Sequence, residues 1–377
     1  MADTTGSGAN RAFVRTETLP QAPPPLSTRG WIGWLRENLF SSPLNAALTI
    51  GALYVLYLFV PPLIEWAIIE AVWTGASNAD CKGHDGACWA IVPARFGQFI
   101  YGFYPEAERW RADLVFILFC INVAPILSDR LPGRTFAALF IVSGFPIVAG
   151  LILFGGIGLE AVPTDRWGGL LLTLVLAVVS ILFSLPLGIL LALGRRSEMP
   201  IVSTFSIAFI ELCRAVPLIT VLFMASFMLP LFLPEGVNFN ELLRALIGVT
   251  IFASAYMAEV VRGGLQALPK GQTEAAQALG LTYWQAMRLI IMPQALKIVI
   301  PGIVNTFISL FKDTSLVSII GLFDLLLVAK ASVTDPKWLG LEHEAYIFTA
   351  LLYFVFCFGM SRYSLWLEGK LDTERRD

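Results

Sequence analysis

The stretch EAAQALGLTYWQAMRLIIMP, from Glu274 to Pro293, places charged and amide side chains between two long apolar segments. Its apolar residues recur at helical spacing on both sides of Gly280, which predicts two short amphipathic helices joined by a glycine turn. A helix pair with a polar face cannot lie in lipid. We therefore expect it to lie on one face of a membrane and to present one side to a partner. The alternative is an ordinary connector lying on the surface.

The composition of the whole chain is that of a membrane protein. The 377 residues are 56% hydrophobic and 14% charged, whereas soluble domains carry about 25% charged residues. The mean hydropathy is +0.72. Apolar runs that can cross a bilayer as helices recur along the chain. They predict an all-α, polytopic fold with about eight transmembrane helices, near residues 45–67, 113–127, 135–157, 167–194, 201–234, 241–261, 295–311 and 346–366. Pro217 and Pro230 predict that the fifth span is broken.

The positions of Lys and Arg predict the orientation. The connections richest in these residues lie on the same side as the N-terminal tail. Both termini and the Glu274 loop are therefore expected in the cytoplasm, with residues 1–43 as a disordered tail and 369–377 as a short one. A polar insertion at 74–112 then lies outside, where Cys81 and Cys88 can form a disulfide. His84 lies between them, so a metal site is the alternative, although a fourth ligand is missing.

Two charged residues lie inside the predicted fifth span. Glu211 and Arg214 are three residues apart, so they share one helix face and can neutralise each other. Charges within a bilayer usually face the interior of a helix bundle or a water-filled path. Both residues are therefore candidates for a substrate pathway, and a structural ion pair that holds the broken span is the alternative.

A second polar group follows the seventh span. A zwitterionic substrate needs a cation partner, an anion partner and hydroxyl or amide groups, and this group supplies all of them. Asn305 lies about two helical turns before it and can face the same path. The alternative is a polar helix end in the outer interface. The candidate pathway residues here are Asn305, Lys312, Asp313, Thr314 and Ser315.

The loop also matches a known pattern. Glu-Ala-Ala, three residues, Gly280, nine residues, Ile290, one residue, Met292 and Pro293 resembles the EAA loop of ABC importer permeases, with Met292 where that family usually has Leu. Four further segments resemble the permeases for polar amino acids, and the sequence preceding them is similar to permeases of general L-amino-acid uptake systems in Gram-negative bacteria. The four segments are ELCRAVPL (211–218), YMAEVVRGG with PKGQ (256–264 and 269–272), NT (305–306) and KDTSL (312–316).

The resemblance implies an architecture and a set of partners. A permease core of five helices would occupy residues 158–368, with the coupling loop at 264–293 and three extra helices at 44–157. In the bacterial inner membrane, an ABC ATPase dimer, a second and non-identical permease and a periplasmic amino-acid-binding protein would complete the importer. By resemblance, the residues that couple to the ATPase are Glu274, Ala275, Ala276, Gly280 and Pro293.

Several function classes receive no support from the sequence. There is no Gly-x₄-Gly-Lys-Ser/Thr pattern, so we expect no cofactor on this chain and ATP hydrolysis by a partner. No catalytic triad, metal motif or nucleic-acid partner is expected, so the chain is predicted to be a transporter subunit and not an enzyme. The first rival is an ion-coupled secondary amino-acid transporter, which would need intramembrane carboxylates in matching halves. The second is a membrane enzyme or sensor that uses the 74–112 insertion.

Overall fold

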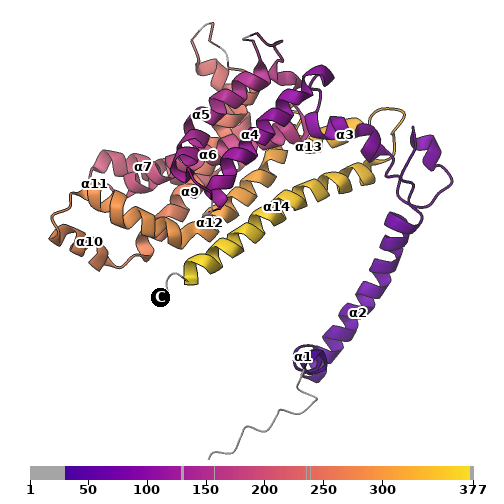
Figure 1. Cartoon of the computed structure of the whole chain (residues 1–377), viewed down its shortest axis with the longest axis horizontal. Helices are drawn as coiled ribbons and strands as arrows, with labels where there is room; N and C mark the ends of the chain where they lie inside the picture. The colour runs from indigo at the N-terminus through magenta and orange to yellow at the C-terminus, as the bar shows by residue number, and fades with distance from the viewer. Residues whose placement is uncertain (1–29, 129–130, 157, 235, 238, 374–377) are drawn as a thin grey trace, which may run out of the picture. The chain divides into compact units, whose positions relative to one another are not determined.

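The computed structural model describes residues 30–128, 131–156, 158–234, 236–237 and 239–373, and this part of the chain is helical without any strand (Figure 1). Within it, seven helices are long and apolar enough to cross a membrane, and a bent pair of helices makes an eighth span. The predicted all-α, eight-span architecture is therefore confirmed. The chain divides into two compact units, Met1–Glu70 and Ala71–Asp377.

The first unit contains one long apolar helix. A short helix, α1 (Gly30–Asn38), lies within the segment predicted as a disordered tail, whose residues 1–29 are outside the described part. Ser42 caps the next helix, α2 (Pro43–Ile64), by accepting a hydrogen bond from the backbone N–H of Asn45 at 3.1 Å. None of the residues of α2 is buried within the structure. A helix that is apolar on every side is expected to face lipid or another membrane helix.

The second unit is organised around two central helices, α6 and α9, which pack along each other. Glycines make this contact close, because a Cβ added to Gly188 would lie 2.7 Å from the Cβ of Met257. A Cβ on Gly264 would lie 2.6 Å from the carbonyl oxygen of Ala295, so α9 and α12 are equally close. The remaining long helices surround this centre. The bounds are α4 (Arg109–Leu127), α5 (Arg134–Phe154), α6 (Gly169–Arg195), α9 (Glu241–Ala267), α12 (Met292–Asp313) and α14 (Glu342–Thr373).

The predicted fifth span is broken at Pro217. Its first half is α7 (Pro200–Ala215), and its second half, Leu218–Phe232, begins with α8 (Leu218–Phe223). The two halves are bent by 107°. Proline has no backbone N–H and disfavours helical geometry in the preceding residue. Val216 is accordingly extended, with φ −101° and ψ 136°. The helix therefore cannot continue through this position, and irregular backbone lies among the membrane spans.

The polar insertion packs on the segment before α14. Its helix α3 (Ile91–Tyr101) and the helix α13 (Leu325–Ser332) lie at one end of the second unit (Figure 1). Cys81 and Cys88 are joined by a disulfide, with their Cα atoms 5.8 Å apart, so neither thiol is free to bind metal with His84. The backbone N–H of Cys88 donates to Oε1 of Glu344 at 2.9 Å.

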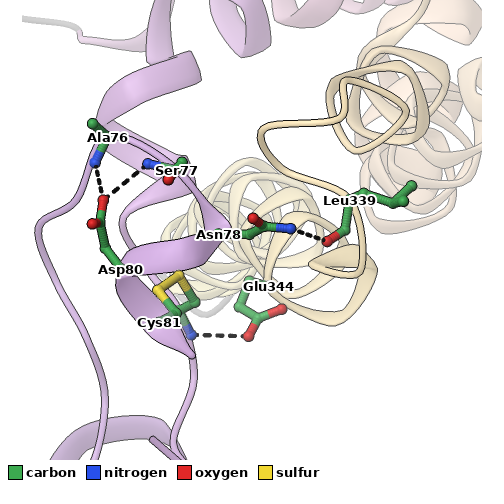
Figure 2. The surroundings of a disulfide bond; sticks show 8 residues. Ala76, Ser77, Asn78, Asp80, Cys81, Leu339 and Glu344 are labelled. Carbon is green, nitrogen blue, oxygen red and sulfur yellow. Dashed lines mark hydrogen bonds between the residues drawn. A yellow bond between two sulfur atoms is a disulfide. The ribbon is translucent and has the colours of Figure 1, made fainter. Parts of the chain in front are cut away.

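Two further contacts hold the insertion in place. The side-chain amide of Asn78 donates to the carbonyl of Leu339 at 2.9 Å (Figure 2), and Arg95 forms an ion pair with Asp335. A hydrogen bond from the backbone N–H of Lys337, together with Arg95, holds the pKa of Asp335 below its usual range. The insertion is thus tied to the first turn of α14 and to the loop before it by hydrogen bonds and a charge pair.

Candidate functional site

The Glu274 loop forms the predicted helix–turn–helix. Its first helix, α10 (Lys270–Ala278), ends at Gly280, whose φ of +74° is left-handed and suits glycine. Thr282 then caps α11 (Tyr283–Ala286), because its hydroxyl accepts from the Gln285 backbone N–H at 3.4 Å while Oε1 of Gln285 accepts from the Thr282 N–H at 2.9 Å. A π-helical turn (Met287–Ile291) leads into α12, with Pro293 in its first turn.

The loop has one packed side and one free side. Ala276 is fully buried, and Ala286, Met287 and Ile291 pack with it against α6, α9 and α12. On the free side the exposed fraction is 77% for Leu279 and 66% for Trp284. Glu274 and Ala275 are also exposed. Large apolar side chains that stay exposed on a polar loop mark an interaction surface. This free side of the loop, with Leu279, Tyr283, Trp284 and Leu289, is called the docking face below.

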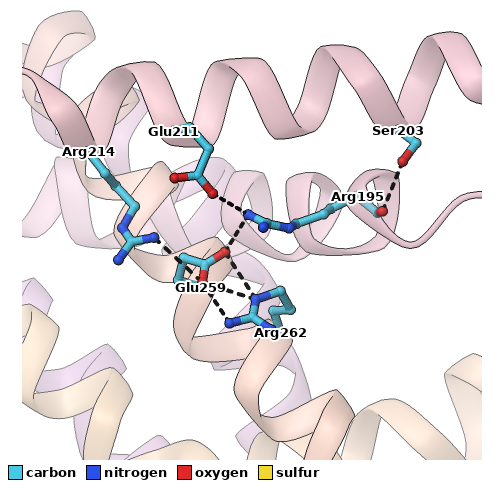
Figure 3. Close-up of polar contacts among 6 residues, drawn as sticks. All are labelled: Arg195, Ser203, Glu211, Arg214, Glu259 and Arg262. Carbon is cyan, nitrogen blue, oxygen red and sulfur yellow. Dashed lines mark hydrogen bonds and ion pairs between the residues drawn. The ribbon is translucent and has the colours of Figure 1, made fainter.

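An ion-pair cluster joins three helices, α6, α7 and α9 (Figure 3). Glu259 of α9 is the centre: its carboxylate accepts from Arg195 of α6 at 2.8 Å and from Arg262 at 2.9 Å, and lies 3.6 Å from Arg214 of α7. Arg195 also donates to Glu211 at 2.9 Å. Charge-assisted hydrogen bonds of this kind are about twice as strong as neutral ones. The cluster therefore fixes the ends of α6 and α7 to α9, the helix that leads into the loop.

A polar cavity of about 580 Å³ opens at the break in the fifth span. Arg214 lies at this break, and its guanidinium carbon is 5.8 Å from the centre of the Tyr256 ring, within cation–π range. Asn305, Ser309 and Asp313 line the cavity from α12. The volume lies within the range of about 300–1,000 Å³ that is typical of small-molecule sites. One cavity thus contains a guanidinium, a carboxylate, an amide and hydroxyl groups.

The structure brings together three of the seven candidate pathway residues. Arg214, Asn305 and Asp313 line the polar cavity. The expected neutralisation of Arg214 by Glu211 is wrong, because Glu211 pairs with Arg195 and Arg214 pairs with Glu259 (Figure 3). The other three candidates do not line the cavity. Lys312 is exposed, Thr314 is fully buried and donates to Phe311 O at 2.7 Å, and Ser315 donates to Lys312 O at 2.8 Å.

Sequence reasoning missed two contributors to this region. Ser309 lies four residues after Asn305 and four before Asp313, so the three share one face of α12, and this spacing was a readable signal. The second is Arg195, which lies after the predicted fourth span, in a connection whose Arg residues predict only the cytoplasmic side. Its partners, Glu211 and Glu259, are 16 and 64 residues away. No local spacing in the sequence could have indicated these ion pairs.

Comparisons with known proteins agree with this architecture. Residues 184–373 match the family model described as "Binding-protein-dependent transport system inner membrane component". The chain is 54% identical to the inner membrane amino-acid ABC transporter permease protein YhdY of Escherichia coli (strain K12), over 91% of this chain and 93% of that protein. It is 45% identical to the glutamate/glutamine/aspartate/asparagine transport system permease protein BztC of Rhodobacter capsulatus, over 98% of this chain and 100% of that protein.

A solved structure of an amino acid ABC transporter with histidines shares 34% identity and a TM-score of 0.46, covering 52% of this chain and 90% of that chain. None of these comparisons supports the ion-coupled alternative. The chain belongs to the family of binding-protein-dependent transport system inner membrane components, the permease subunits of type I ABC importers.

Proposed function

We propose that this chain carries polar L-amino acids through the polar cavity into the cytoplasm. The observation that supports this best is that Arg214 and Asp313 line the same cavity at the broken span. The guanidinium suits the α-carboxylate of an amino acid and the carboxylate suits its α-ammonium group. Asn305 and Ser309 would then contact a polar side chain of the substrate. YhdY and BztC, whose names refer to amino acids, agree with this substrate class.

In this proposal, the free energy of ATP hydrolysis reaches the permease through contact between the ATPase and the docking face. An ABC ATPase dimer binds the loop around Glu274, Ala275, Ala276, Gly280 and Pro293 and hydrolyses ATP. The glycine turn and the buried Ala276 hold the docking face rigidly, so movement of the ATPase is transmitted to α9 and α12. Both termini and this loop lie in the cytoplasm. A periplasmic binding protein delivers the substrate on the opposite side, and a second, non-identical permease completes the pathway.

Uptake by the whole importer in vesicles tests the cavity. The measurement is ATP-dependent uptake of labelled amino acids delivered by the binding protein, with Arg214→Gln, Asp313→Asn and Ser309→Ala in turn. Hydrogen bonds to charged groups contribute about 1.5–3 kcal/mol. Loss of either charge should therefore lower uptake at limiting substrate by about 10- to 150-fold.

Ser315→Ala is the matched control, because Ser315 follows on the same segment but does not line the cavity. Uptake should be unchanged in this control and lower by several-fold in Ser309→Ala. Equal uptake by the Asp313→Asn variant and the wild type, with normal assembly of the complex, would exclude the cavity as the substrate path. Uptake that continues without ATP but stops when the proton gradient is removed would exclude an ABC mechanism altogether.

A further inference from the structure

A second cavity, distinct from the polar one, lies between the extra helices and the core. Its volume is about 350 Å³, and its walls come from α4, α5, α6 and the start of α9. Apart from Trp167 and Asn240, the lining residues are aliphatic, phenylalanine, alanine, glycine or proline. Phe116 and Leu243 at its walls are 49% and 41% exposed. All four helices are candidate membrane spans, so this apolar groove faces the hydrocarbon interior of the bilayer.

The groove exists because α5 has small residues where it faces α6. Ala149 and Gly150 line it, and a Cβ built on Gly150 meets no atom within 4 Å. An engineered apolar cavity of about 150 Å³ stays free of water and binds benzene. The groove is more than twice that size, so leaving it empty would forfeit many dispersion contacts. An aliphatic chain from the surrounding membrane supplies those contacts without any loss of hydrogen bonds.

A polar pocket adjoins one end of the groove. It has a volume of about 470 Å³ and shares Asn240 and Leu242 with the groove. Arg244 lines this pocket together with two carboxylates, Asp165 and Glu241. The Arg244 side chain is only 14% exposed and lies 4.0 Å from Glu241. One of its terminal N–H groups donates to the carbonyl oxygen of Ser226, and its Nε–H finds no hydrogen-bond partner within the described part of the chain.

The two cavities together match an amphiphile with one polar end. The guanidinium of Arg244 suits a phosphate, and the carboxylates of Asp165 and Glu241 suit an ammonium group while repelling a second negative charge. We propose that a zwitterionic phospholipid binds here, with an acyl chain between α5 and α6 and its phosphate and ammonium groups at Arg244, Asp165 and Glu241. The lipid would seal the extra helices α4 and α5 against the transport core.

Photolabelling of the whole importer in vesicles tests the acyl-chain site. The vesicles contain phosphatidylethanolamine and phosphatidylglycerol, and one of the two carries a diazirine on its acyl chain. Labelled peptides are identified by mass spectrometry. The variant Gly150→Phe places a phenyl ring in the groove, and since benzene needs about 150 Å³, this ring would occupy nearly half of it. We expect labelling of α5 and α6 to fall by at least about tenfold, or about 1.4 kcal/mol.

Gly359→Phe is the matched control, because Gly359 lies on α14 and its Cβ position is also open. This variant should label α5 and α6 as the wild type does. Arg244→Gln tests the polar end, with Arg166→Gln as its control, since Arg166 neighbours Asp165 but does not line the pocket. The wild type and the Arg166 variant should prefer the phosphatidylethanolamine probe by several-fold, because only its headgroup carries an ammonium group for Asp165 and Glu241. The Arg244 variant should lose labelling by both probes, because both headgroups carry the phosphate.

Each of the following results would overturn the proposal or its headgroup part. The first is equal labelling, in the wild type, of the groove helices and of the lipid-facing side of α14. It would show that no specific lipid site exists between α4, α5, α6 and α9. Undiminished labelling in a Gly150→Phe variant that assembles normally would do the same. Crosslinks from residues of the groove to the second permease or to α2, in place of lipid, would show that a protein helix is the occupant. Equal labelling by the two headgroups would exclude the role given to Asp165 and Glu241, and undiminished labelling of the Arg244 variant would exclude the role given to Arg244.

Discussion

Replacing Gly280 tests the coupling loop with little disturbance to the rest of the chain. The residue has φ +74°, and a Cβ at this position would meet no atom within 4 Å. A side chain here causes no clash within this chain, so only the backbone conformation is affected. For a residue with a Cβ, the left-handed conformation costs about 1–2 kcal/mol, whereas Asn tolerates it well. A β-branched residue is expected to be the least compatible.

The free-energy cost of the left-handed conformation sets the expected loss of ATPase affinity. If the ATPase binds only the native turn, Gly280→Ala should weaken binding by the same free energy, about 5- to 30-fold. Gly280→Val should weaken it further, and Gly280→Asn should stay close to the wild type. Binding of the purified ATPase to the permease complex in detergent measures the affinity, and vesicle assays give the amount of substrate transported per ATP. Both quantities should fall in the order Gly, Asn, Ala, Val.

Two results would refute this reasoning. Wild-type affinity and uptake in Gly280→Val would show that the turn does not control docking. Equal impairment in Gly280→Asn and Gly280→Val would show that any side chain at this position obstructs the partner, so that the left-handed backbone is not the cause. Normal folding of each variant is checked by its elution volume and by the thermal midpoint of the isolated permease.

Three further predictions follow from the fold. Glu259→Gln leaves the surrounding guanidinium groups without their central charge, so the free energy of unfolding should fall by about 1–3 kcal/mol, seen as a lower thermal midpoint. Reduction of the Cys81–Cys88 disulfide, which closes a short loop with a sequence separation of 7, should destabilise the insertion by about 2.5 kcal/mol and speed proteolysis there, whereas Cys120→Ser should have no such effect. Burial raises the pKa of Asp324, which caps α13, to about 6. The folded state therefore binds this proton more tightly than the unfolded state, and stability should fall as the pH rises from about 4 to about 6. Asp324→Asn keeps the cap but cannot titrate, so the thermal midpoint of this variant should change less between about pH 4 and about pH 6. A pH dependence equal to that of the wild type would contradict this prediction.

The spans could be read from the sequence because lipid imposes a strict rule on composition. A bilayer-crossing helix must be apolar over about 20 residues, so each predicted span corresponds to a helix or a helix pair in the structure. The break at Pro217 was readable for a similar reason, since the missing N–H is a local property. Helix α3 was not predicted, because its 11 residues lie in a polar insertion and are too few to cross a bilayer. It is stabilised by packing against α6, α13 and α14.

The sequence predicted only some of the residues of the polar cavity. Arg214, Asn305 and Asp313 stood out as polar residues in apolar surroundings, and the structure places them in one cavity. The expected Glu211–Arg214 pair failed because spacing along a helix shows which side chains can meet, whereas a neighbouring helix can offer a better partner. Here Arg195 and Glu259 are those partners. Pairing between helices depends on tertiary packing, which local patterns do not contain.

The position of Glu259 has a mechanical consequence. One carboxylate tethers α6 and α7 to α9, while the glycine contacts at Gly188 and Gly264 leave no space between α6, α9 and α12. Helices joined in this way can move little relative to one another. A pull on the loop between α9 and α12 would therefore move the four helices together, and the pivot would be found at Val216 and Pro217, whose backbone is extended.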